Sequence, residues 1–219
     1  MIKSKFAPEK KLREMDNGRV RVLHDKKEIM ARALPLSLVC ALSETGTATK
    51  SPDAKAIIHF IKKNKMKKAL SPKELKFVFN KKKNEREVAE FNWHYERLGV
   101  LLWAIGYDNL PGFDKMVDAS ELIRTTHDPE FIEKAVPRSI EELIEYERVA
   151  NEAYWICVDS KLNGKTVGDY SGIDINPEVA LERLVAIRWI VGEEAVDWDG
   201  VLPDTYCPYA RECGGSDKK

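Results

Sequence analysis

The chain has 219 residues, of which 43% are hydrophobic and 33% are charged. A chain of this length can bury a core that needs no disulfide or structural metal. The longest apolar run, residues 98–105, is too short to cross a bilayer, and residues 1–8 are not followed by the apolar segment of a signal peptide. We therefore expect a soluble cytoplasmic protein with no membrane partner.

Cysteine and histidine spacing gives no support for a metal site. The four cysteines (Cys40, Cys157, Cys207 and Cys213) form no CxxC pair, and the four histidines form no HxxH, HxxxH or HExxH pattern. Cys40 and Cys157 fall in apolar helical patterns and are expected to be buried. For Cys207 and Cys213, two free thiols are favoured over a local bridge or a metal site. We expect a reducing compartment and no cofactor.

Charge is balanced overall but divided unevenly along the chain. Residues 1–83 hold 22 basic and 8 acidic side chains, whereas residues 84–219 hold 14 basic and 28 acidic ones. The two parts either attract each other within the fold or present opposite charges to partners.

The first third predicts helices after an N-terminal extension, residues 1–20. Apolar spacing indicates a helix over 21–42, which Pro35 can kink or split. Ser51 and Pro52 begin a second helix, which ends in lysines near residue 66. A capping box that starts at Ser71 opens a short helix through residue 79.

The strongest helical pattern begins at Asn84 or Glu85 and runs to Ile105. Apolar residues recur there at steps of three and four, and Gly106 follows as a stop. From Leu98 onward this segment is apolar on every side, so its second half should lie deep in the core.

The remaining segments complete an all-α prediction. A loop over 107–117 precedes short helices near 118–126 and 129–135, and a long helix over 139–163 starts with a capping box at Ser139. A loop over 165–175, a helix over 177–191 and an irregular tail follow. The sequence thus predicts an irregular multi-helix bundle built on two long buried helices, with no significant sheet. One domain covers 21–205, its lysine-rich first third packed on a C-terminal helical core, and 206–219 form a tail.

Three charged residues, Glu96, Asp159 and Arg183, interrupt apolar helical faces. An unpaired charge there would cost several kcal/mol, so these side chains should find partners, most simply one another. A buried ion network that aligns the helices is the favoured interpretation. The alternative is a pocket in which Glu96 or Asp159 acts as an acid or base.

Carboxylates also gather near the end of the chain, where Asp197, Asp199 and Asp204 surround Trp198 and precede Thr205. Clustered carboxylates can bind a hard cation, but their spacing does not match an EF-hand. Asp and Thr also form turns and caps. We favour the second interpretation, with Trp198 closing the end of the bundle.

Four segments together resemble one known family. They are residues 92–106, residues 157–164, Glu182-Arg183 with Trp189, and residues 197–205. In this order and spacing they are similar to the domain of unknown function family numbered forty-two seventy-two, over roughly residues 20–205. The resemblance implies a helical domain and brings no established activity.

The lysine-rich stretch, residues 62–83, contains ten lysines and no arginine, interleaved with Phe77 and Phe79. Lysines with aromatic residues can bind nucleic-acid phosphates and bases. No nucleic-acid-binding motif accompanies them, and arginine is the usual reader of base edges. A solvated face, or a face docked on the acidic half, is therefore favoured, and a nucleic-acid partner is not expected.

Three functional hypotheses follow, in this order. The first is a non-enzymatic interaction or accessory module with an unknown protein partner. The second is an enzyme or a small-ligand or metal binder that uses the Glu/Asp/Arg cluster, and the third is a nucleic-acid binder that uses residues 62–83.

Overall fold

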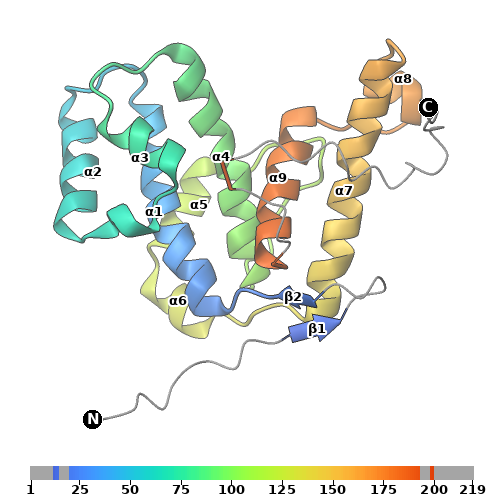
Figure 1. The fold of residues 1–219 in the computed structure, drawn as a ribbon, viewed down its shortest axis with the longest axis horizontal. Helices are drawn as coiled ribbons and strands as arrows, with labels where there is room; N and C mark the ends of the chain where they lie inside the picture. The colour runs from blue at the N-terminus through green and yellow to red at the C-terminus, as the bar shows by residue number, and fades with distance from the viewer. Residues whose placement is uncertain (1–11, 15–19, 193–197, 200–219) are drawn as a thin grey trace, which may run out of the picture.

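Four helices lie side by side and form the body of the molecule. The computed structural model describes residues 12–14, 20–192 and 198–199. Helix α4 (Glu85–Ala104) packs between α1 (Lys26–Glu44) and α9 (Pro177–Ile190), and α7 (Ile140–Leu162) packs on the far side of α9 (Figure 1). This arrangement confirms the all-α bundle that the sequence predicts.

Helix α4 is central because its second half has no polar face to turn toward water. Asn84 caps its first turn in a capping box with Glu87, and every residue from Leu98 to Leu102 is buried. An apolar stripe on one side would bury a helix against one neighbour; an all-round apolar surface requires neighbours on several sides.

A smaller group of helices covers the first half of α4. It comprises α2 (Pro52–Lys63), the 3₁₀ helix η1 (Met66–Ala69) and α3 (Pro72–Phe79), seen on the left of Figure 1. Their own apolar cluster joins them to α1 and α4, with the rings of Phe77 and Phe91 stacked 4.1 Å apart. The lysine-rich segment is therefore attached through its aromatic residues.

Three short helices and two short strands complete the described chain. Helices α5 (Ala119–Thr126) and α6 (Pro129–Lys134) follow the loop after α4, and α8 (Val167–Ser171) follows α7. Strands β1 (Leu12–Glu14) and β2 (Val20–Val22) pair antiparallel, with Arg13 opposite Arg21.

The structure corrects the prediction at two places. The first helix begins at Lys26, because Asp25 and Glu28 form a capping box there; residues 20–22 form a strand, and the helix continues through Pro35. The predicted loop over 165–175 contains α8, which Thr166 caps at Asp169 N. Five residues are too few for apolar periodicity to reveal a helix.

Candidate functional site

Glu96 and Arg183 form an ion pair in the interior, between α4 and α9. The Nε atom of Arg183 donates to Oε2 of Glu96 at 2.8 Å. The Arg183 side chain is 0% exposed and the Glu96 side chain is 2% exposed. Each charge thus satisfies the other in a region where neither could remain unpaired.

The other polar atoms of this pair hold the loop between α4 and α5. The two terminal guanidinium nitrogens of Arg183 donate to the carbonyls of Pro111 at 2.5 Å and Lys115 at 3.0 Å. Oε1 of Glu96 accepts a hydrogen bond from the backbone N of Val117 at 2.9 Å. One ion pair therefore connects α4, α9 and the loop between α4 and α5.

Aromatic rings surround this pair. The ring of Phe113 lies 5.3 Å from the Arg183 guanidinium carbon, and the Tyr146 ring lies 4.4 Å from that of Trp103. Burial raises the pKa of Tyr146 to about 12, although the charge of Arg183 opposes the rise. The tyrosine thus stays neutral at physiological pH, beside the charged pair.

A second ion pair connects the same two helices in the opposite sense. Arg97, next to Glu96, donates to the carboxylate of Glu182, next to Arg183. Each helix therefore contributes a Glu-Arg dipeptide, and each dipeptide supplies the acid to one pair and the base to the other. A leucine follows both dipeptides, so the same three-residue sequence occurs in α4 and α9.

Trp198 connects this second pair to the lysine-rich part of the chain. Its indole lies 4.0 Å from the guanidinium carbon of Arg32 and 5.3 Å from that of Arg97, and its carbonyl accepts from Arg97. Its Nε1 donates to Oε1 of Glu74 at 3.0 Å, and Arg32 forms an ion pair with Glu74. Five side chains from five segments thus share one buried polar centre.

Asp199 binds the start of α3. Its Oδ2 accepts a hydrogen bond from the backbone N of Lys73 at 2.8 Å, and its Oδ1 accepts from the hydroxyl of Ser71, the N-cap residue. A carboxylate at a helix N-terminus satisfies amide groups that have no partner within the helix. Asp199 therefore serves here as a cap.

Asp159 does not join Glu96 and Arg183. Helices α7 and α9 are antiparallel: Arg188 lies 3.7 Å from Glu147, and Cys157 belongs to one apolar cluster with Ala180. A residue beyond Cys157 on α7 lies level with the start of α9, away from Arg183. Of the three charges that the sequence groups together, the structure thus pairs Glu96 with Arg183, and among the described residues neither of them is bonded to Asp159.

The other members of the predicted cluster are Asp197, Asp204 and Thr205, which lie outside the described residues. Within the part of the chain that is described, no three His, Cys, Asp or Glu side chains are arranged to hold a metal ion. In that same part, no helix is long and apolar enough to span a membrane.

His94 is buried beside the second polar centre. Burial lowers the pKa of its imidazole well below the ordinary value, and the charges of Arg97, Arg32 and Lys73 lower it further. The edge of its ring meets Phe91, with ring centroids 4.8 Å apart. A neutral histidine among cations serves as a packing residue here.

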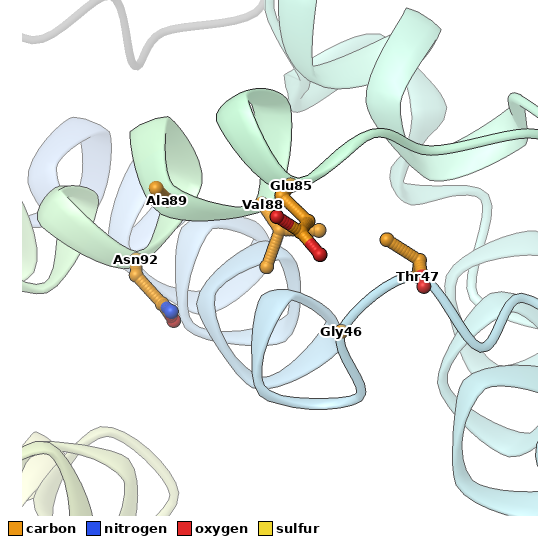
Figure 2. A pocket seen from close by; sticks show the side chains of 6 residues that line it. All are labelled: Gly46, Thr47, Glu85, Val88, Ala89 and Asn92. Atoms are coloured by element: carbon orange, nitrogen blue, oxygen red, sulfur yellow. The ribbon is translucent and has the colours of Figure 1, made fainter.

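An open surface hollow of about 350 Å³ lies where the end of α1 meets the start of α4. Figure 2 shows its lining residues, which include Thr47, Glu85 and Asn92. None of the candidate site residues within the described part of the chain lines it. The Asn92 Oδ1 atom already accepts from the hydroxyl of Ser43 at 2.6 Å.

Sequence reasoning missed most members of the buried polar network: Arg32, Glu74, Arg97, Glu182, Glu147 and Arg188. One signal was present, because the repeated Glu-Arg-Leu sequence places an acid and a base side by side on two apolar helices. For Arg32 and Glu74 no local pattern identifies the partner, since they are 42 residues apart.

These features define an all-helical domain in which buried Glu–Arg pairs connect the central helices. The family model described as Domain of unknown function (DUF4272) matches residues 6–201, and the chain belongs to this family. No curated protein and no solved structure matches the chain.

Proposed function

We propose that this protein is a non-enzymatic interaction module, a rigid helical scaffold that acts through its surface. The observation that carries this proposal is the complete hydrogen bonding of Glu96 and Arg183, two members of the charged cluster that the sequence offers as a possible active site. Both carboxylate oxygens accept hydrogen bonds from the protein, and all three guanidinium nitrogens donate to it.

A general acid or base needs a path to the proton that it transfers, within hydrogen-bond reach. The 2% exposure of Glu96 and its two occupied oxygens argue against that role. The pair instead connects α4, α9 and the loop that follows α4, which favours a structural role.

The second polar centre supports the same proposal. Glu74 is fully buried, and its carboxylate is bonded to Arg32, to Trp198 and to the backbone N of Ser71. Because the Glu74 carboxylate is already bonded within the protein, this centre is better suited to hold a scaffold together than to bind a ligand.

The test begins with thermal unfolding of the full chain in the presence of divalent cations, nucleotides and small carboxylates. Ligands that bind the folded state raise the melting temperature in a saturable way. We expect no such rise. We also expect affinity capture with the tagged chain to recover a macromolecule that binds the purified chain at a fixed stoichiometry.

A saturable rise with one small molecule would overturn the proposal if Glu96→Gln abolished it and Asp159→Asn did not. That pair of variants separates a ligand site at the buried pair from binding elsewhere. Absence of any stoichiometric macromolecular complex would also count against an interaction module.

A further inference from the structure

Residues 50–83 form a strongly cationic surface, here called the lysine lobe. This segment contains twelve lysines and two acidic residues, Asp53 and Glu74. The structure exposes eleven of the lysines: Lys50, Lys55, Lys62, Lys63, Lys65, Lys67, Lys68, Lys73, Lys76, Lys81 and Lys82. Because Glu74 is buried against Arg32, it does not neutralise this surface.

The lobe packs on the first half of α4, in the acidic part of the chain, mainly through apolar side chains such as Phe77 and Phe91 and not through ion pairs of its exposed lysines. Among residues 20–192 and 198–199, one exposed lobe lysine forms an ion pair, Lys73 with Glu90 at 3.5 Å. The exposed glutamates of α7, including Glu141, Glu145 and Glu152, lie at the opposite end of the long axis from α2 (Figure 1). Of the two possibilities that the uneven charge leaves open, these contacts favour a cationic face that is presented to a partner.

The lobe is attached to the rest of the fold mainly by apolar packing. The lobe is held by apolar side chains beneath it, among them Ile61, Leu70 and Phe77, all of which are buried. Crowded like charges repel one another and oppose compact structure. Two of the eleven, Lys62 and Lys67, lie over the ring of Phe79, but only one of the eleven forms an ion pair among the described residues, so the surface is suited to an external polyanion.

From this uncompensated charge we infer, contrary to the expectation from the sequence, that the lysine lobe binds the phosphate backbone of nucleic acid without sequence preference. This inference rests on the proposed function and names its partner class. Lysine binds phosphate as a point charge, whereas base edges are read mainly by arginine, which the lobe lacks. The recognised feature is thus the backbone.

A protein partner fits this surface less well. Protein–protein interfaces are depleted in lysine and have an apolar, aromatic-rich centre. The lobe exposes one large apolar side chain, Phe60, at 45%. A single exposed ring among lysines resembles instead the stacking platforms of proteins that bind single strands.

The dimensions of the lobe agree with a run of phosphates. Helix α2 has 12 residues and is about 18 Å long at 1.5 Å per residue. Measured along the axis of a duplex, the phosphates of one strand recur about every 3.4 Å, so the length of α2 corresponds to roughly five of them. Phe60 lies near the end of α2, where it can stack on an unpaired base.

The experiment measures anisotropy of a fluorescent 30-nucleotide single strand of mixed sequence, and of its duplex, with the full chain at several salt concentrations. The test variant is Lys55→Gln/Lys63→Gln/Lys68→Gln, which neutralises three lobe charges. The matched control is Lys115→Gln/Lys161→Gln/Lys165→Gln, which neutralises three exposed lysines elsewhere. Circular dichroism checks folding; exposed positions such as these are expected to tolerate the change.

We expect affinity that falls steeply with salt, a loss of at least ten-fold in the lobe variant and less than two-fold in the control. The slope of log K against log salt should become shallower by up to about 2 for single strands in the lobe variant. Phe60→Ala should weaken single-strand binding roughly ten-fold and duplex binding much less.

No binding at low salt, or equal losses in both triple variants, would overturn the inference. So would preferential binding of polyglutamate or of anionic vesicles over both nucleic acids. If the lobe variant failed to fold, the salt dependence of wild-type binding and the effect of Phe60→Ala would still decide whether the lobe binds nucleic acid. If the chain bound no nucleic acid but formed a stoichiometric complex with a protein, the inference about the lobe would be wrong and the proposed function as an interaction module would still stand.

Discussion

The indole Nε1 of Trp198 lies 3.0 Å from Oε1 of Glu74, a residue 124 positions earlier in the chain. This hydrogen bond joins the last described segment to the start of α3. The two guanidinium groups beside the indole, those of Arg32 and Arg97, belong to α1 and α4. Trp198 is therefore the residue through which the lysine-rich helices and the central helices share one polar centre.

Replacing Trp198 by alanine should destabilise the protein by about 3–5 kcal/mol, the usual cost of deleting a large buried ring. Trp198→Phe keeps a ring between the arginines and removes the bond to Glu74, which costs about 1–3 kcal/mol. Chemical denaturation measures both. Trp155→Phe is the matched control, because the buried Nε1 of Trp155 has no hydrogen-bond partner within the described residues; an equal loss in that variant would contradict the assigned role.

Arg183→Met should cost about 3–5 kcal/mol, because it leaves the Glu96 carboxylate buried without its cation. The carbonyls of Pro111 and Lys115 also lose their donor. Denaturant midpoints measure the loss. Arg148→Met removes an exposed arginine with two glutamate partners and should leave the midpoint nearly unchanged. Similar midpoints for the two variants would mean that the buried pair does not fasten the helices.

Stability should fall as pH drops below about 6.5, the ordinary pKa of histidine. The pKa of His94 is lowered in the folded state by burial and by nearby cations, so the unfolded chain binds the proton more readily. Since the unfolded state then holds more protons, the free energy of unfolding decreases with falling pH, by up to about 1.4 kcal/mol per pH unit for this group.

Denaturation at pH 5 to 8 tests this, with His94→Gln expected to flatten the profile. The pKa of His127 is also lowered by burial and contributes in the same direction, so His127→Gln serves as the companion variant. A profile that neither substitution changes would rule out the histidines as its source.

Gly106→Ala should destabilise the protein by several kcal/mol. Gly106 has φ +111°, and a Cβ there would lie 2.9 Å from the carbonyl oxygen of Val136. Gly164→Ala is the control, since its φ of +64° is strained for alanine but no atom lies within 4 Å of the added Cβ. That change should cost about 1–2 kcal/mol. Thermal or denaturant unfolding compares them, and equal losses would mean that contact with Val136 is unimportant.

Helix boundaries could be predicted wherever capping chemistry and apolar periodicity agree. Residues 84–105 and 139–163 were predicted as helices, and α4 and α7 match them to within a residue or two. Helix α8 was missed because five residues give no periodic signal, and β2 because an apolar residue such as Val22 suits a helix and a strand equally.

The candidate site was predicted only in part. Glu96 and Arg183 were each recognisable as charges on apolar faces, and their pairing follows from the cost of burying either alone. Asp159 meets the same local criterion, but it lies level with the start of α9 and so away from Arg183. Its position depends on how α7 and α9 are aligned along their lengths, which the sequence of neither helix reveals.

The sequence by itself determined which segments become helices and which charges must find partners, because capping, periodicity and desolvation act over a few residues. Tertiary structure alone decided the choice of partner: Glu96 with Arg183, Arg97 with Glu182, and Glu74 with both Arg32 and Trp198. Those choices depend on the register and direction of packed helices, which no local pattern encodes.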